Sequence, residues 1–258
     1  MAFNKNELIL DKVRSLTAHD LSTGEMLFRL TSLEDPSLSC TAEGEEIVDA
    51  IGALITTLYR AKKATFSASN SLISLDLAAA QYGTKKEIGS TDKKVVVPTY
   101  EIIAIEEGKT SITLKQTPVG EVKYIYSIVN GEIGTVFKAG SAASATDFVI
   151  DEKEITLPTG LAGKVYVEYS YETENANRIV NKTSEFPEAC SMKIYAYFRD
   201  KCNENIVYSG VIVSPKAKLN PEQVELALTS TGKHAFEFQM MRDYCDEEAE
   251  LFSIIVAE

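Results

Sequence analysis

The sequence predicts a mainly β protein, an antiparallel sandwich or barrel with one flanking α-helix and a small inserted β domain. Three observations lead to this fold class. Apolar residues occupy every second position along many short runs, which is the period of half-buried strands. Gly, Pro, Asn and Asp separate these runs at short, even intervals. The segment 71–82 repeats its apolar residues with a clear helical period.

The first part of the chain predicts strands that lead into the helix. Residues 6–16 fit either a short helix or a strand, and residues 25–31 alternate as a strand. A stretch rich in Ser, Asp and Pro then predicts a loop that ends at Cys40. Residues 53–69 are rich in β-branched and aromatic residues, which favours one long strand interrupted at Lys62.

The helix is predicted over residues 71–82. Leu72, Leu75 and Ala79 recur at spacings of three and four, which would place them on one face against the sheet. Asn70 or the serine before it can cap the first turn, and Gly83 can end the helix in a left-handed conformation. We expect this helix to pack on the core and to hold no site.

The middle of the chain predicts a separate small β domain. Between residues 94 and 174, short strands follow one another at even spacing, which is typical of a small sandwich or barrel. Polar segments lie on both sides of it. We therefore expect one tube-like β domain made of residues 1–93 and 175–258, with a β-sandwich-like domain at 94–174 inserted between them.

The C-terminal part predicts an antiparallel sheet. Every second residue from Cys190 to Phe198 is apolar, and after a polar turn the run 206–213 alternates again, which indicates a hairpin. Further alternating runs are found at 224–228, 235–240 and 251–256.

Composition limits the classes of function. The net charge of −12 argues against general binding of phosphate backbones, because such binding needs an excess of Lys and Arg. The sequence has neither a signal peptide pattern nor a long apolar run, so we expect synthesis in the cytoplasm and no membrane partner. Four scattered cysteines without a C-x-x-C pair favour reduced, buried thiols.

Patterns for catalysis are nearly absent, so we expect no enzyme, no cofactor and no metal. Gly108-Lys109-Thr110 is better explained as a hairpin turn than as a phosphate loop. The carboxylates between Asp243 and Glu250 could hold calcium, but such runs are more often solvated loops. His234 is expected in a turn, and His19 has no partner in sequence.

Several stretches resemble the tail tube proteins of tailed bacteriophages. The resemblance covers residues 47–83 and 189–256 and lies in pattern and order. It is carried by Val48–Leu58, Ala64–Asn70, Met192–Phe198, Val211–Leu219, Phe236–Phe238, Asp243–Cys245 and Leu251–Val256.

The resemblance implies a virion structural protein that assembles into stacked, hexameric rings and forms the channel for DNA ejection. Related tubes occur in contractile bacteriocins and type VI secretion systems. The implied partners are copies of the chain and other tail proteins: a sheath, the tape measure, the tail terminator and the baseplate. DNA would be met only in transit, and the protein would reside in the virion tail after assembly in the host cytoplasm. The insertion at 94–174 departs from the simplest members.

Within this hypothesis, an acidic lining would let DNA pass because it repels phosphate at short range. Polar positions of the C-terminal strands are the candidates for the lumen or the subunit interface: Lys193, Tyr195, Tyr197, Glu225, Glu237 and Gln239.

Two alternatives stay open. One is another phage structural role, such as a neck, tail-completion or head decoration protein. The other is a carbohydrate-binding β-sandwich that uses tyrosines as stacking platforms, although alternating tyrosines within strands are more often packing residues. The tyrosines concerned are Tyr124, Tyr126, Tyr166 and Tyr169.

Overall fold

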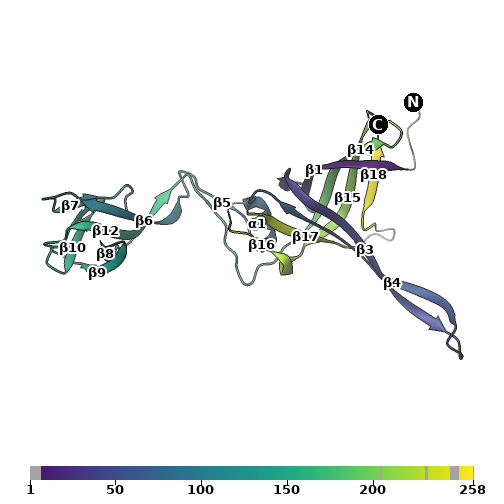
Figure 1. Ribbon diagram of the computed structural model, residues 1–258, viewed down its shortest axis with the longest axis horizontal. Coiled ribbons are helices and arrows are strands. Elements are labelled where there is room, and N and C mark those ends of the chain that lie inside the picture. The colour runs from purple at the N-terminus through teal and green to yellow at the C-terminus, as the bar shows by residue number, and fades with distance from the viewer. Residues whose placement is uncertain (1–6, 204, 230–231, 245–249, 258) are drawn as a thin grey trace. The chain divides into compact units, whose positions relative to one another are not determined.

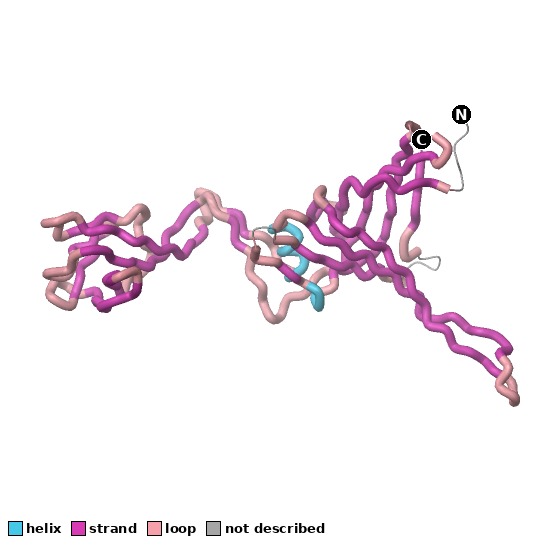
Figure 2. Tube along the Cα trace, in the orientation of Figure 1, coloured by secondary structure: helices cyan, strands magenta, loops and turns pink. Residues whose placement is uncertain are grey.

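A computed structural model describes residues 7–203, 205–229, 232–244 and 250–257. It is mainly β, with antiparallel sheets and one short α-helix (Figures 1 and 2). The chain folds into two compact units, one made of residues 1–86 and 179–258 and the other of residues 87–178. The fold class predicted from the sequence is therefore confirmed.

The first unit is built on a nine-stranded sheet. Strand β3, at one end of the sheet order, contacts β1 near the other end, so the sheet is nearly closed, like a barrel. Strand β16 (Glu225–Leu226) pairs with β17, and β18 (Ser253–Ala257) pairs with β15. The main order is β2 (Met26–Leu30), β1 (Leu8–Asp20), β14 (Ala189–Asp200), β15 (Val207–Leu219), β17 (His234–Met240), β4 (Leu54–Asn70) and β3 (Leu33–Val48).

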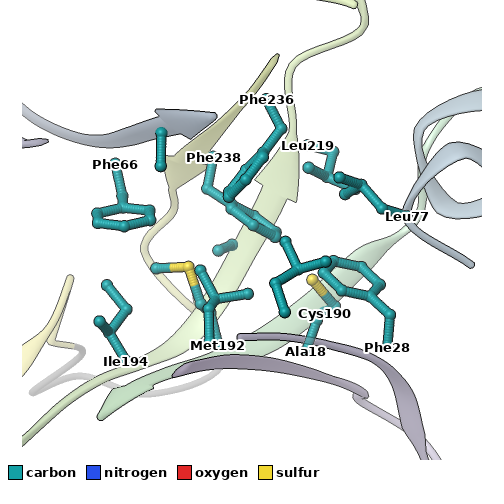
Figure 3. Packing of buried hydrophobic residues seen from close by; sticks show 14 of the residues in the cluster. Ala18, Phe28, Phe66, Leu77, Cys190, Met192, Ile194, Leu219, Phe236 and Phe238 are labelled. Atoms are coloured by element: carbon teal, nitrogen blue, oxygen red, sulfur yellow. The ribbon is translucent and has the colours of Figure 1, made fainter. Parts of the chain in front are cut away.

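One face of this sheet forms the core of the first unit. Strand β14 contributes Cys190, Met192 and Ile194, as its alternation predicts, and each is at most 2% exposed. Aromatic rings from different strands complete the packing (Figure 3): the Phe28 and Phe238 centroids lie 6.3 Å apart. The hydrophobic positions of sequence-distant strands thus meet on one side, and their polar positions share the other side.

Helix α1 (Leu75–Tyr82) packs against this core through Leu77, which is fully buried. It begins four residues later than the predicted 71–82, because Ser74 and not Asn70 caps it: the Ser74 hydroxyl accepts from the backbone N–H of Leu77 at 3.3 Å. Gly83 ends the helix as predicted, with φ of 68°. A Cβ at Gly83 would lie 2.1 Å from the carbonyl oxygen of Phe186, so only glycine fits there.

The loop predicted to end at Cys40 is instead part of strand β3. Register shifts between Glu34 and Ser37 and between Thr41 and Glu43 let this polar strand follow β4. Asp35 adopts a positive φ of 50° at the first irregularity. The polar composition reflects an edge strand whose residues are mostly exposed, and not an absence of pairing.

The second unit has its own sheet and its own core. All pairs in the sheet are antiparallel except β9 with β10. Its fully buried side chains include Ile125, Phe148 and Ile155. The strand order is β6 (Val95–Ile105), β12 (Gly163–Thr173), β8 (Tyr124–Val129), β9 (Glu132–Ala139), β10 (Asp147–Asp151), β11 (Glu154–Thr156) and β7 (Ser111–Thr113).

Strand β9 was not foreseen from the sequence, because only one of its residues, Phe137, is buried and it shows no alternation. The predicted strand at 224–228 is reduced to β16, since a short 3₁₀ turn (Pro221–Gln223) comes before it. The chain enters and leaves the second unit through a short pair, β5 (Glu87–Ile88) with β13 (Asn177–Arg178).

Candidate functional site

A strongly exposed apolar feature of the first unit is the far end of the β3–β4 hairpin, residues 41–63, which we name the hairpin arm. The arm extends beyond the rest of the sheet (Figure 1). Near its tip, Ile51 is 89% exposed, Ile55 is 64% exposed and Tyr59 is 75% exposed. A contiguous group of exposed apolar side chains on a folded protein marks an interaction surface.

The arm is held in shape without being buried. At its turn, the Asp49 carboxylate accepts from the backbone N–H groups of Ile51 and Ala53, at 2.9 and 2.7 Å. Along its strands, the ring of Tyr59 lies over Gly44, where a Cβ would approach the ring to 3.3 Å. A two-stranded ribbon is only marginally stable alone. The hydrogen bonds at the turn and the contact of Tyr59 with Gly44 give the arm a defined shape, while its apolar residues stay exposed.

The ion pairs of the arm are exposed and contribute little to its stability. Arg60 lies 3.0 Å from Glu45, and Lys63 lies 3.2 Å from Glu43, with all four side chains more than half exposed. These pairs do neutralise most of the charge along the strands. The arm thus presents chiefly apolar contacts to a partner.

The sheet also offers unpaired strand edges. Strand β15 pairs with β18 through Ser209–Val213 and with β17 through Ala217–Leu219, so its two ends have different neighbours on one side. Among the described residues, β18 pairs with β15 alone. An open edge presents N–H and C=O groups to which a strand of another chain can bond.

The predicted site residues of β14 lie together on the non-core face of the sheet. Lys193, Tyr195 and Tyr197 alternate with the buried residues of the strand, and Tyr195 is 36% exposed. Strand β1 adds two cations that were not predicted: Lys12 Nζ and the Arg14 guanidinium lie 6.0 and 5.7 Å from the centroid of the Tyr197 ring. They could not be found from the sequence, because the pairing of β1 with β14 brings them there.

The other predicted site residues lie on the same non-core face but farther along the sheet. Glu237 and Gln239 occupy alternate positions of β17, and Gln239 pairs with Lys218. Glu237 accepts from the Asn220 side-chain amide at 3.0 Å. Glu225 pairs with Ala235 through β16, which puts it on that face by register. Two groups of predicted residues thus share a face and belong to different strands.

His234 is not a turn residue, as the sequence suggested, but a fully buried residue at the start of β17. Its Nδ1 accepts from the backbone N–H of Ser74 at 3.4 Å, so its Nε2 donates to the Gln81 side-chain oxygen at 2.6 Å. Burial lowers the pKa of His234, which keeps the ring neutral. This histidine fixes helix α1 to the sheet and has no access to a substrate.

The remaining candidates give no catalytic constellation. Of the C-terminal carboxylates, Asp246, Glu247 and Glu248 lie outside the described residues, while Asp243 lies 3.3 Å from Lys216. Across the described ranges, no three His, Cys, Asp or Glu side chains gather where a metal could bind. Cys40 and Cys202 are exposed rather than buried, and Cys190 is buried as expected.

The tyrosines of the second unit divide into two kinds. Tyr169 belongs to the core, where it donates to the Glu101 carboxylate, so it cannot serve as a platform. Tyr166 lies between Tyr100 and Tyr126 on the outer face, with centroid distances of 5.4 and 6.0 Å. These rings pack on one another, as is typical of cross-strand tyrosines, while Tyr124 is 45% exposed and takes no part in this group.

A family model described as the YomU/Tube protein family matches residues 8–254. The match spans both units, including the hairpin arm and the non-core face. No curated protein matches the chain. In the part of the chain that the structure describes, no helix is long and apolar enough to cross a membrane.

Proposed function

Since the chain belongs to the YomU/Tube protein family, a phage structural family, we propose that it assembles into stacked rings that form a phage tail tube. Six copies in each ring and a central channel for DNA ejection follow from the resemblance to tail tube proteins. This role needs surfaces that are completed only by other copies of the chain. A structural role also agrees with a family of structural tube proteins.

The hairpin arm is the observation that carries the proposal. Its apolar side chains lie on both faces of a two-stranded ribbon, so a partner must surround the arm and not merely touch one side. Burying a large aliphatic side chain contributes about 1.5–3 kcal/mol. Several such residues in one arm supply enough free energy for association, provided that the arm is already ordered.

We assign assembly to the first unit and propose that the second unit is a domain inserted into the tube subunit. The arm belongs to the first unit; the second unit has its own core, and its sheet ends in the edge strands β6 and β7 without a comparable arm among the described residues. The tube would contact a tail terminator, a tape measure, a baseplate and, in a contractile tail, a sheath. The subunits would assemble in the host cytoplasm and remain in the virion tail.

Negative-stain electron microscopy of the concentrated protein tests the proposal. We expect rings or tubes of uniform diameter, and their loss when residues 45–58 are replaced by a two-residue turn. Uniformly monomeric full-length protein at high concentration would overturn the proposal. Single rings that never stack would favour a neck or tail-completion role instead.

A matched shortening of the β8–β9 hairpin in the second unit provides the control. That hairpin has exposed apolar residues as well, for example Val129 and Ile133. If both shortened proteins lost assembly to the same degree, the arm would have no special role and the proposal would fail.

A further inference from the structure

Four cations lie on the non-core face of neighbouring strands in the first unit. Arg29 on β2 pairs with Thr17 on β1, which pairs with Lys193 on β14, so these residues form one row across the sheet. Lys12 lies opposite Tyr197, farther along the same strands. Together with Arg14, beside that ring, Arg29, Lys193 and Lys12 form what we name the cationic face.

The cationic face is unusual in a chain whose net charge is −12. None of its four cations has a carboxylate within ion-pair distance in the described part of the chain. The ion pair that borders the face joins Arg199 to Asp11 at 3.2 Å; Asp11 is the chain neighbour of Lys12, and Arg199 lies two residues beyond Tyr197 on β14. Four like charges on one face repel one another and favour a negatively charged partner.

Two polar atoms of the same face lack a hydrogen-bond partner within the described ranges. They are the hydroxyl oxygen of Thr17, a residue only 5% exposed, and Nδ1 of His19. Thr17 lies directly between Arg29 and Lys193 in the row. Buried polar groups are normally satisfied. Both atoms are shielded from solvent, so they lie beneath the cations and are not themselves open to a partner.

The remaining side chains of the face fit a nucleic acid better than an acidic protein. Tyr195 and Tyr197 present aromatic rings among the cations, a combination typical of surfaces that bind sugar-phosphate backbones. The hairpin arm of another copy is a poorer occupant, because two of its carboxylates, Glu43 and Glu45, are already paired with Lys63 and Arg60.

We propose that the cationic face binds the phosphate backbone of DNA without reading its sequence. Neighbouring strands are about 4.8 Å apart, so Arg29 and Lys193, two strands apart, start about 10 Å apart, and flexible side chains let them reach successive phosphates. The negative net charge of the chain does not prevent this contact, because salt screens the interaction between surface charges beyond about 10 Å. The inference concerns a single subunit and does not depend on tube formation.

Binding through this face is expected to be weak and strongly dependent on salt. Four phosphate contacts predict that the affinity for duplex DNA falls about a hundredfold when salt rises from 50 to 200 mM. Contact of this kind would hold DNA loosely at low salt and release it at higher salt. It would therefore be compatible with DNA that only passes by.

The test uses the full chain and a fluorescently labelled 20-base-pair duplex, measured by anisotropy at several salt concentrations. The variant Lys12→Gln with Arg29→Gln removes two exposed cations of the face. We expect its affinity at 50 mM salt to fall tenfold or more, and the slope of log affinity against log salt to fall by about 2.

The matched control is Lys138→Gln with Lys164→Gln, which removes two exposed cations from strands of the second unit. It changes the net charge equally and should leave duplex binding within twofold. The inference is overturned if the wild-type chain does not bind the duplex at 50 mM salt, or if both variants lose affinity equally.

Repeating the measurement on the chain with the shortened arm separates this inference from the proposed function. Duplex binding should persist in that protein even though assembly is lost. If binding disappeared together with assembly, DNA contact would require a ring, and the single-subunit inference would be wrong. Failure of the wild-type chain to form tubes would leave the expected DNA binding unchanged.

Discussion

Replacing two apolar residues of the hairpin arm, in the variant Leu54→Ser with Ile55→Ser, should prevent assembly without unfolding the subunit. These side chains are 58% and 64% exposed, so their removal leaves no cavity in the core. Substitutions at exposed positions usually change the free energy of unfolding by less than about 0.5 kcal/mol. The isolated subunit should therefore keep its thermal stability.

The expected effect on assembly follows from the area that a partner would cover. Full burial of a Leu or Ile contributes about 1.5–3 kcal/mol, so covering the exposed part of each contributes about 1–2 kcal/mol. Losing both costs about 2–4 kcal/mol per contact. Because 1.4 kcal/mol corresponds to a factor of ten, the critical concentration for assembly should rise roughly 30-fold to several hundredfold.

Sedimentation of assembled material over a range of protein concentrations measures this critical concentration. The control Val129→Ser with Ile133→Ser changes side chains that are 58% and 62% exposed in a hairpin of the second unit. It should leave the critical concentration within a factor of about three, or 0.6 kcal/mol. An unchanged critical concentration in the arm variant, with folding intact, would refute the assignment of the arm to subunit contacts.

Three further predictions concern the two cores. Burial lowers the pKa of His234 below its usual 6.5, so the unfolded chain takes up the proton first as pH falls. The free energy of unfolding, measured by urea titration, should decrease between pH 7 and 5.5. The substitution His234→Gln should make this decrease smaller; the same dependence of unfolding free energy on pH in both proteins would argue against a role for His234. In the second unit, burial and the hydrogen bond to Glu101 raise the pKa of Tyr169 to about 12. Tyr169→Phe should cost about 1–2 kcal/mol in urea unfolding, because Glu101 keeps only the backbone N–H of Lys115 as a donor and the backbone N–H of Gln116 loses its acceptor; a cost below 0.5 kcal/mol would contradict the role of this bond. Burial also raises the pKa of Cys190 to about 12, so alkylation followed by mass spectrometry should label Cys40 in the native protein and Cys190 only after unfolding.

Much of the fold could be predicted because many strands alternate strictly. In β14, β17 and the second half of β4, each apolar residue points into one core, so the pattern itself identifies the buried face. The ends of helices and strands are harder to predict from the sequence. Asn70 and Ser74 are both good caps, and only the packing of Leu77 on the sheet decides between them.

Strands without a buried face could not be predicted. Residues 33–40 of β3 are polar and irregular, yet they pair with β4 because a bulge at Asp35, with a φ of 50°, absorbs the mismatch; Ala61, also with a φ of 50°, lies at the next register shift, between Thr41 and Glu43. The sequence around His234 predicts a turn, because its neighbours Thr231-Gly232-Lys233 favour one. Its burial depends on Gln81, which is distant in sequence and carries no signal of the contact.

Only part of the candidate site could be predicted from the sequence. Alternation along one strand is enough to place Lys193, Tyr195 and Tyr197 on the polar side of a sheet. The cations that surround them come from β1 and β2, and their position depends on the register of those strands. Bulges near Lys12 and Arg14 shift that register, and nothing in the local sequence specifies the shift.

The way the chain enters and leaves the second unit has a consequence for protein engineering. Ile88 pairs with Asn177, so the two crossing points are already neighbours. Joining them with a short turn would leave the first unit with almost no added cost of loop closure. The same position should accept an unrelated domain whose termini are close together, which would make the subunit a carrier for displaying foreign modules in many copies.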